Sequence, residues 1–497
     1  MRDSATGKGR ASARGGRCEV RLSEAVPAAR FIGCDDIVVG ACQDEAGRCR
    51  PGDVFVARLT DRGDGHEEVP LAIARGAVAV VAERIVSTDG LPLCLVSDAD
   101  WAHARLCHAL AGDPSREMRV IAVAGTSGKT TTVWLTAAVL AEAGHRVGVL
   151  SDLGCLGPDD AEPVAADIAS PATLAHALAG LAAAGCSHAI VEVSSRMLAA
   201  QATAGMTTDT VVFTSRAVAH LDRHSTPRAY RDVLTRIMET LAADGCLVTG
   251  LPAAARQRLL ASAPVGTTLL AAGLRADCDV HARPLDGSLF GRTFLLESGG
   301  QTVPVAVDTP TVPFVRDTVL AAAVGSRYGV TLEHAARGIE AAGSVPGRLE
   351  RLDRGQDAAV FIDAPSSMHA VSSSIASLRR LTPGRLTVIA DAALARRLGG
   401  RAFASRLGRW SDACVIVPAT VASDEPTSED VAAYARVDRL LASLGGGDCV
   451  VVLGCPPPQG HGPRGPWGGQ TTLAMLVDGW LQLAHPAEAP FAGRRAA

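Results

Sequence analysis

One short segment of this 497-residue chain has the residue types and the spacing that bind nucleotide phosphates. An apolar run over 120–124 leads directly into Gly125, Thr126, Ser127, Gly128, Lys129, Thr130 and Thr131. Glycines let backbone N–H groups turn toward phosphate oxygens, and the helix that follows adds positive potential. The lysine then reaches the outer phosphates, and the Thr130 hydroxyl ligates Mg²⁺. The segment predicts an ATP site at 125–131, although Val123 replaces the first glycine of the general pattern.

Lys129 is one of only two lysines in the sequence, and the other, Lys8, lies in a basic amino-terminal tail. Every other cationic side chain is arginine. Arginine replaces lysine on most surfaces, but a phosphate loop needs a compact charge on a thin stem. Retention of a single lysine at this place indicates that nucleotide binding still matters.

The elements expected around this loop are those of an α/β domain. We predict a helix over 131–143 that ends at Gly144, followed by strands over 146–150, 189–193 and 210–214. Short β-branched strands that alternate with helices are typical of a parallel sheet covered on both faces. Around 278–308 the pattern changes, and turns at Asp286-Gly287 and Gly299-Gly300 predict a small antiparallel patch.

Composition and length predict several domains in this chain. We expect an α/β fold with three domains, of which the central one binds ATP on a mostly parallel sheet and the last is Rossmann-like. The boundaries are a disordered basic tail over 1–19, then domains over 20–110, 111–343 and 344–497. Buried-strand candidates in the outer domains are 53–57, 77–82, 359–363, 386–390, 413–417 and 449–453.

Several classes of function are disfavoured by the bulk numbers. A net charge of −4 and an aromatic content of 3% give no reason to expect a nucleic-acid partner. The sequence has no uninterrupted run of 18 apolar residues, so we expect no membrane span. The amino-terminal tail also lacks the apolar core of a signal peptide. The 13 cysteines are scattered, which is typical of buried thiols in a reducing cytoplasm, with a zinc site or a disulfide as the alternative.

The phosphate loop and five other segments resemble one family of enzymes. The segment 125–132 is similar to the ATP loop of the Mur ligases, which join an amino acid to a growing peptidoglycan precursor. The segments 50–57 and 72–83 resemble the first domain of the tripeptide-forming members, which extend UDP-N-acetylmuramoyl-dipeptide. Matches to the central domain and to the entry of the third are Glu192-Val-Ser-Ser195, His220-Leu-Asp-x-His224 and Val345-Pro-Gly-Arg-Leu-Glu350.

The resemblance implies a chemistry and a set of residues. ATP phosphorylates a carboxylate, and the amine of the incoming amino acid attacks the acyl phosphate. Lys129, Glu192 and His220 would be catalytic, with Thr130, Glu192 and His220 as Mg²⁺ ligands. The implied cofactors are ATP and Mg²⁺, and the implied partners are a UDP-muramoyl-peptide and other cell-wall enzymes. The resemblance also implies a protein that is cytoplasmic and monomeric. The alternatives are a structural ion pair for Glu192 and a plain loop role for His220.

The sequence departs from the family at positions that carry its chemistry. A lysine that becomes carbamylated and binds metal in the family aligns with Leu234, and arginine does not form that carbamate. The resemblance therefore implies a missing or weakened second Mg²⁺ site, with Asp222 or Asp232 as substitutes if activity survives. Further losses fall within 45–47 (or 44–46 with a one-residue shift), 196, 215–219, 315, 318, 363–368, 390–394, 419–422 and 454–458.

Three hypotheses about function follow. The first is an ATP-dependent cell-wall ligase with reduced or lost activity. The second is a non-catalytic nucleotide-binding paralogue that regulates or accompanies cell-wall enzymes. The third hypothesis is a Mur-like ligase that acts on folate or polymeric amino acids. It has less support, because the first domain resembles the type that binds UDP precursors. The identity of an incoming amino acid is open, since the motif that would read it is absent.

Overall fold

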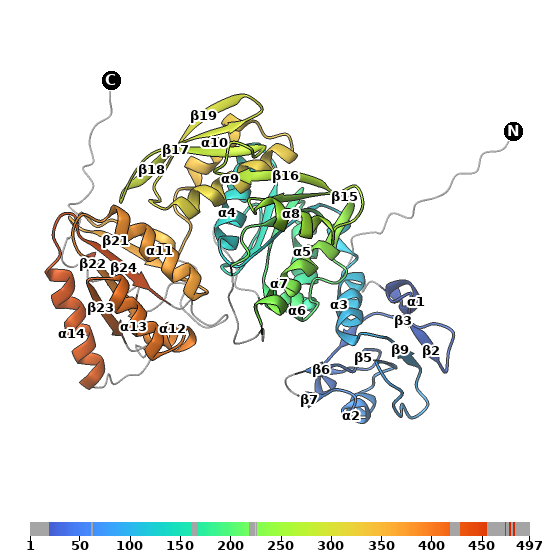
Figure 1. The fold of residues 1–497 in the computed structure, drawn as a ribbon. Coiled ribbons are helices and arrows are strands. Elements are labelled where there is room, and N and C mark those ends of the chain that lie inside the picture. Colours follow the sequence, from blue (N-terminus) through green and yellow to red (C-terminus); the bar gives the residue numbers. More distant parts are fainter. Residues whose placement is uncertain are drawn as a thin grey trace, which may run out of the picture. The chain divides into compact units, whose positions relative to one another are not determined.

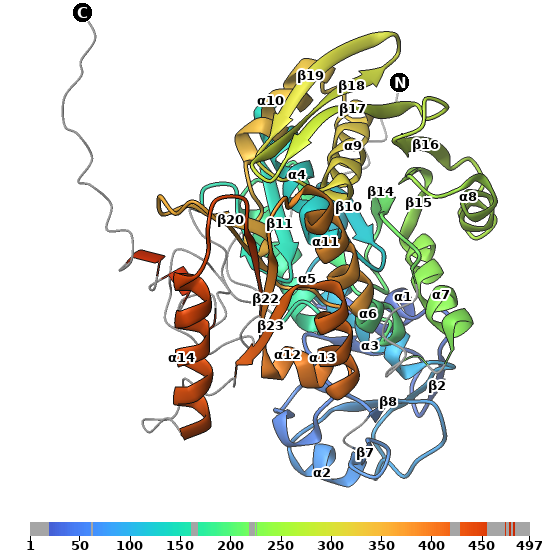
Figure 2. The same ribbon diagram turned by 60° about the vertical axis from the view of Figure 1, so that its left-hand side comes forward.

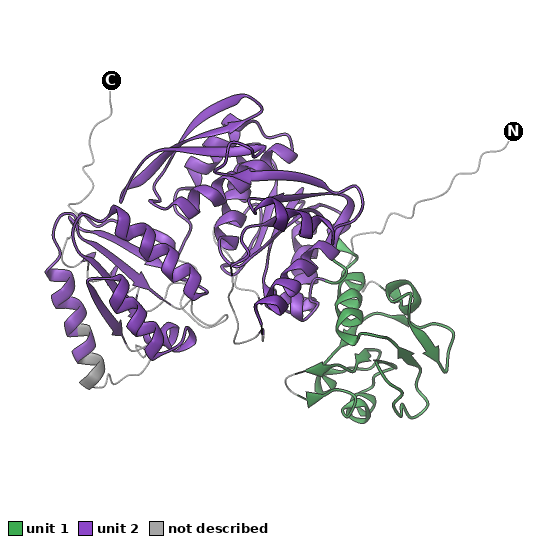
Figure 3. Cartoon of the chain, viewed as in Figure 1, with its two compact units in different colours: residues 1–114, 204–206 green, residues 115–203, 207–497 purple. Residues whose placement is uncertain are grey.

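The structure is a computed structural model that describes residues 19–60, 63–160, 167–217, 224, 226–417 and 428–454, with 473, 477, 478, 481 and 482. The tail predicted over 1–19 lies outside this part except for Glu19. The chain forms two compact units, residues 1–114 with 204–206 and residues 115–203 with 207–497 (Figure 3). No helix among the described residues is both long and apolar enough to cross a bilayer.

The first unit is built on a five-stranded sheet with helices on both faces. Its strand order is β2 (Arg30–Ile32), β9 (Leu93–Leu95), β8 (Ala79–Ala82), β5 (Val54–Val56) and β4 (Cys42–Gln43). Successive side chains of a strand point to opposite faces. Val54 and Val56 therefore join the core beneath α1 (Leu22–Ala25) and α3 (Ala99–Leu110). Phe55 joins the core beneath α2 (Val69–Ala74). Two-stranded ribbons pair β1 (Val20–Arg21) with β3 (Val38–Val39) and β6 (Leu59–Thr60) with β7 (Gly63–Asp64).

The second unit contains a ten-stranded sheet, which confirms the predicted α/β class. Its order is β12 (Gly154–Leu156), β11 (Val147–Ser151), β13 (His188–Val193), β10 (Arg119–Ala124), β14 (Thr208–Phe213), β15 (Leu241–Thr249), β16 (Thr268–Gly273), β17 (Val280–Ser288), β18 (Gly291–Ser298) and β19 (Gln301–Val307). Neighbours from β11 through β17 run parallel, so the sheet is mostly parallel as predicted.

Three helices cover one region of this sheet, one of them far from the other two in sequence. They are α4 (Lys129–Glu142), α9 (Val312–Arg327) and α10 (Leu332–Ala342), which pack side by side (Figures 1 and 2). Leu135 and Val139 of α4 share one core with Ile121 and Val123 of β10. The predicted end of α4 is confirmed: Gly144 has φ +85°, and its N–H donates to the Ala141 carbonyl. Further helices are α5 (Pro171–Ala183), α6 (Ser195–Ala199), α7 (Pro227–Thr235) and α8 (Ala253–Leu260).

The antiparallel patch is confirmed, but one predicted turn is wrong. Gly299 and Gly300 do connect β18 to β19, whereas Asp286 and Gly287 lie inside β17, opposite Thr293 and Arg292. A register shift between Pro284 and Asp286 interrupts the ladder where proline has no N–H to donate. The strand resumes after this bulge, so the chain reverses at 289–290 instead.

The second unit also holds a five-stranded sheet in the order β20 (Arg348–Leu352), β21 (Ala359–Asp363), β24 (Cys449–Leu453), β22 (Leu386–Asp391) and β23 (Ala413–Val417). The strands predicted over 359–363, 413–417 and 449–453 are confirmed residue for residue. Phe361 and Val451 face α11 (Met368–Leu381), α12 (Ala392–Arg397) and α13 (Arg401–Trp410). Val360 and Val450 face α14 (Ser428–Ala442). The three-domain boundaries at 110 and 343 stay predictions.

Candidate phosphate-binding site

The predicted phosphate loop lies where β10 ends and α4 begins. Gly125 and Gly128 both have positive φ, +142° and +82°. A Cβ on Gly125 would collide with the Thr214 hydroxyl, and one on Gly128 would collide with the Asp317 carboxylate. Both positions therefore require glycine for two reasons, the backbone conformation and the close approach of another side chain.

The first half of the loop is fixed by the end of the neighbouring strand β14. The Thr126 N–H donates to the Ser215 carbonyl at 3.2 Å, and the Ser127 N–H donates to Ser215 Oγ at 2.9 Å. Thr214 Oγ1 donates to the Ser127 carbonyl at 2.6 Å. The N–H groups left for a phosphate are those of the first turn of α4, at 129–131, because a helix offers them no internal partner.

Glu192 lies beside this turn because β13 pairs with β10, with Glu192 opposite Val123. Its Oε1 accepts a hydrogen bond from Thr130 Oγ1 at 3.1 Å and lies 3.8 Å from Lys129 Nζ. Its Oε2 accepts the Asp152 N–H at 3.2 Å. Burial raises the pKa of Glu192 to about 7; the Asp152 charge adds to the shift and the Lys129 charge opposes it. Lys129, Thr130 and Glu192 are thus brought together.

Two of the predicted metal ligands have the spacing that Mg²⁺ requires. An octahedral Mg²⁺ with oxygens at about 2.1 Å places adjacent ligand atoms about 3 Å apart. Thr130 Oγ1 and Glu192 Oε1 are 3.1 Å apart, so they fit two neighbouring positions. Asp152, which lines the same pocket, is a further oxygen donor that sequence reasoning missed. Its signal was its place two residues after the strand predicted over 146–150, at the edge where ligands of parallel sheets bind.

Of the remaining candidates, those that the structure describes do not join this cluster. His220 and Asp222 lie outside the described residues. His224 makes a hydrogen bond of 3.2 Å between its Nε2 and Ser195 Oγ, as fits a loop role. Leu234 is completely buried in the core. Asp232 is largely exposed, 3.7 Å from Arg228, and does not line the pocket.

Arg348 of β20 enters the pocket and contacts the predicted magnesium ligand. Its guanidinium donates to Thr130 Oγ1 at 2.9 Å and to the Ala364 carbonyl. Sequence reasoning used Arg348 only as part of the block 345–350 and gave it no role at the site. The pocket holds about 140 Å³, less than the roughly 300–1,000 Å³ usual for small-molecule sites. We therefore expect Arg348 to leave Thr130 when a nucleotide binds.

Asp317 of α9 is an acidic group in a site that should receive phosphate. It lines the pocket, and its carboxylate approaches Gly128 in the loop. Burial raises the pKa of Asp317 well above its usual range, against the opposing effect of the Arg316 charge. A charged carboxylate here would repel a bound nucleotide, whereas a protonated one would not.

We expect Asp317→Asn to raise the midpoint of thermal unfolding and to tighten ADP binding roughly tenfold, about 1.4 kcal/mol. A raised folded-state pKa means that the charged carboxylate costs folding free energy. That cost grows as pH rises from the unfolded-state pKa through the folded-state pKa. Unfolding scans and calorimetry between about pH 5 and 8 should show the variant's advantage increasing with pH. Asp232→Asn, at an exposed position, is the control; equal midpoints and affinities for Asp317→Asn and the wild type would contradict the expectation.

Comparisons with known proteins agree on one family. The model of the Mur ligase middle domain matches residues 123–325. A UDP-N-acetylmuramyl-tripeptide synthetase of Roseiflexus sp. (strain RS-1) is 30% identical over 408 residues, 77% of this chain and 78% of the relative. A UDP-N-acetylmuramoyl-L-alanyl-D-glutamate--2,6-diaminopimelate ligase of Corynebacterium efficiens is 30% identical over 463 residues, 84% and 85% of the two chains.

Solved structures of ligases share the fold. One of a UDP-N-acetylmuramoyl-L-alanyl-D-glutamate--2,6-diaminopimelate ligase superposes with a TM-score of 0.66 at 18% identity, over 94% of this chain and 99% of the other. The MurF ligase of Thermotoga maritima in complex with ADP superposes with a TM-score of 0.58 at 17% identity, over 89% and 98%. The similarity extends over nearly the whole length of both relatives.

Proposed function

Because this chain belongs to the Mur ligase family, we propose that it binds Mg·ATP in peptidoglycan precursor synthesis and has low or no ligase activity. The observation that carries this proposal is the buried cluster of Lys129, Thr130 and Glu192 at the start of α4. The reduced activity rests on Leu234, an apolar core residue where the family's metal-binding lysine would stand.

Each residue of the cluster has a role in this proposal. The N–H groups at 129–131 and the Lys129 ammonium bind the outer phosphates. Thr130, Glu192 and Asp152 would hold Mg²⁺, which supplies positive charge against the phosphates. Ser215 and Thr214 orient the loop through the hydrogen bonds to Ser127. Glu192 serves metal binding only when deprotonated.

The proposed second ligand is a UDP-muramoyl-peptide, as in the names of the relatives, and the proposed location is the cytoplasm, where ATP is available. The residues that would select an incoming amino acid fall at 419–422, outside the described part of the chain. The substrate amino acid is therefore left open.

A specific observation favours a second candidate, a nucleotide-binding paralogue without catalysis. The family's glycine-rich loop after β22 corresponds here to 390–394, and this segment begins helix α12. Asp391 Oδ1 accepts the N–H groups of Ala393 and Leu394, at 2.5 and 3.3 Å, and so caps that helix. A carboxylate committed to capping a helix is not free to bind substrate.

A two-stage experiment on the full-length protein tests the proposal. Calorimetry with Mg·ATP should detect binding, and a second titration with UDP-N-acetylmuramoyl-dipeptide should detect the precursor. ADP release with a panel of amino acids then separates the candidates, because only a ligase turns over. Absence of any Mg·ATP binding at millimolar concentration would overturn the nucleotide half, and with it both candidates.

A further inference from the structure

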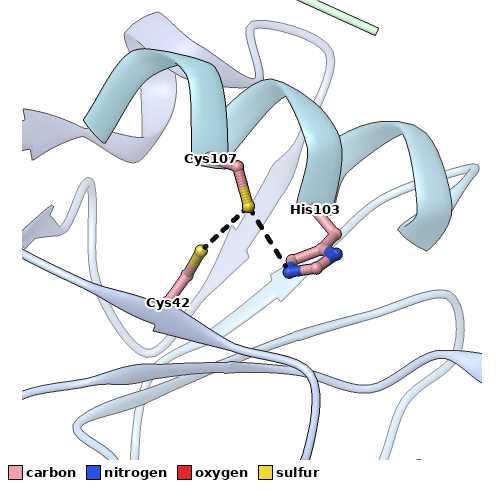
Figure 4. Close-up of side chains that lie close together, drawn as sticks. All are labelled: Cys42, His103 and Cys107. Carbon is pink, nitrogen blue, oxygen red and sulfur yellow. Dashed lines mark hydrogen bonds between the residues drawn. The ribbon is translucent and has the colours of Figure 1, made fainter. Parts of the chain in front are cut away.

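Three potential metal ligands meet in the first unit. Cys42 lies on β4, and His103 and Cys107 lie one turn apart on α3. Residues at i and i+4 share a helix face, and this face points toward β4. Figure 4 shows the three side chains directed at one another. No sequence spacing indicates this group, because 65 residues separate Cys42 from Cys107.

Two of the three distances within the group agree with tetrahedral zinc coordination. Zn–S bonds of about 2.3 Å and a Zn–N bond of about 2.0–2.1 Å place the two sulfurs about 3.8 Å apart, and sulfur and nitrogen about 3.5–3.6 Å apart. Cys42 Sγ and Cys107 Sγ are 3.8 Å apart, and Cys107 Sγ and His103 Nε2 are 3.5 Å apart. All three ligand atoms lie within 4.8 Å of one another.

We propose that Cys42, His103 and Cys107 bind one Zn²⁺ ion. Two thiolates and an imidazole are the donors that favour zinc over magnesium or calcium. The site supplies three protein ligands, so water or another small ligand completes the tetrahedron, and Cys42 is only partly buried, which leaves an approach for it. The metal would join β4 to α3 and stabilise the first unit.

The surroundings of His103 offer a carboxylate to orient the ring, but they also place one hydrogen-bond donor against it. Its Nε2 faces Cys107, so Nδ1 must carry the ring proton when Nε2 binds metal. The Asp44 carboxylate lies 4.0 Å from Nδ1 and would orient the ring, as carboxylates do behind zinc-bound histidines. In this structure Arg58 NH1 can only donate to Nδ1, at 3.3 Å, so metal binding through Nε2 requires this hydrogen bond to be replaced by one from Nδ1–H to Asp44. Arg58 is also paired with both Asp44 and Asp100. Its charge is therefore compensated locally.

A disulfide between the two cysteines is the competing arrangement. A disulfide bond joins sulfurs at about 2.05 Å, whereas these are 3.8 Å apart and free. Formation of the bond would also require an oxidant. A metal at the observed separation needs no movement of the sulfurs.

Metal content of the full chain tests the proposal. The protein is produced with zinc in the medium and without a polyhistidine tag, dialysed against metal-free buffer, and analysed by inductively coupled plasma mass spectrometry. We expect about one zinc per chain in the wild type and in Cys34→Ser, whose cysteine lies in the same unit outside the group. Cys42→Ser, Cys107→Ser and His103→Ala should each retain at least tenfold less zinc.

Cobalt substitution of the wild type gives a second readout that does not depend on a variant folding. Co²⁺ at this site should produce thiolate-to-metal absorption in the near ultraviolet and strong visible bands of tetrahedral coordination. Zinc-free protein that shows neither signal on Co²⁺ addition, while both thiols react with a thiol reagent, would overturn the proposal. So would a Cys42–Cys107 disulfide in protein prepared under reducing conditions, or unchanged zinc in the three variants.

Discussion

Replacement of Lys129 with alanine is expected to weaken Mg·ATP binding about a hundredfold, which corresponds to 2–3 kcal/mol for a charge-assisted contact with phosphate. The side chain is only 11% exposed and ends 3.8 Å from Glu192 Oε1, so it is held at the entrance of α4. Solvent cannot replace this charge in a buried pocket as it could on a surface. Isothermal titration calorimetry with Mg·ATP measures the change.

The chain provides its own control, because Lys8 is the other lysine. Lys8→Ala should bind Mg·ATP as the wild type does. Lys129→Arg should not restore binding, because the planar guanidinium is wider than the compact ammonium group that the loop accommodates. Lys129→Ala also removes a cation beside buried Glu192, so thermal unfolding must show that the variant is folded. Wild-type affinity in folded Lys129→Ala would contradict the phosphate role.

The second large effect concerns turnover, which we expect to lie a hundred- to thousandfold below that of a related ligase. Acyl-phosphate formation brings a triphosphate against a second anion, so the transition state depends on positive charge supplied at the right place. Leu234, buried in the core, supplies no metal ligand where the family has its carbamylated lysine. Coupled ADP-release assays with UDP-N-acetylmuramoyl-dipeptide and amino acids measure the rate.

Added bicarbonate distinguishes loss of the carbamylated lysine from general damage to the enzyme as the cause of low turnover. A related ligase that has the lysine, assayed in parallel, should respond to added bicarbonate, whereas this protein should not. Robust ligation by this protein would mean that another group has taken over the metal. Asp152 is then the first residue to replace, because it lines the pocket, whereas Asp232 is exposed and does not.

The sequence predicts the elements around the phosphate loop well, because their signals are local. The strand before Gly125, the helix that ends at Gly144 and the buried strands of the last sheet depend on short apolar runs and on glycine conformation. The turn at Asp286-Gly287 was wrong because a bulge at Pro284 shifts the register, and no propensity of Asp-Gly reports such a shift.

The candidate site was predicted only in part, for a physical reason. Lys129 and Thr130 come after β10, and Glu192 lies on β13, which pairs directly with β10, so their convergence follows from the order of the sheet. Asp317 and Arg348 reach the same pocket from α9 and β20, which lie far from the phosphate loop in the sequence. Their approach depends on how separate layers pack. Nothing in the sequence near either residue encodes that packing.

The contact between Arg348 and Thr130 has a consequence for which nucleotides the protein prefers. A ligand must displace a guanidinium that already donates to Thr130 Oγ1 at 2.9 Å. The observed affinity is therefore the intrinsic affinity multiplied by the fraction of molecules in which this contact is open. Once released, the arginine is best satisfied by an anionic oxygen. A terminal phosphate within its reach would offset the lost contact, and a shorter ligand would not. We therefore expect the protein to bind nucleoside triphosphates more tightly than diphosphates before any second substrate arrives.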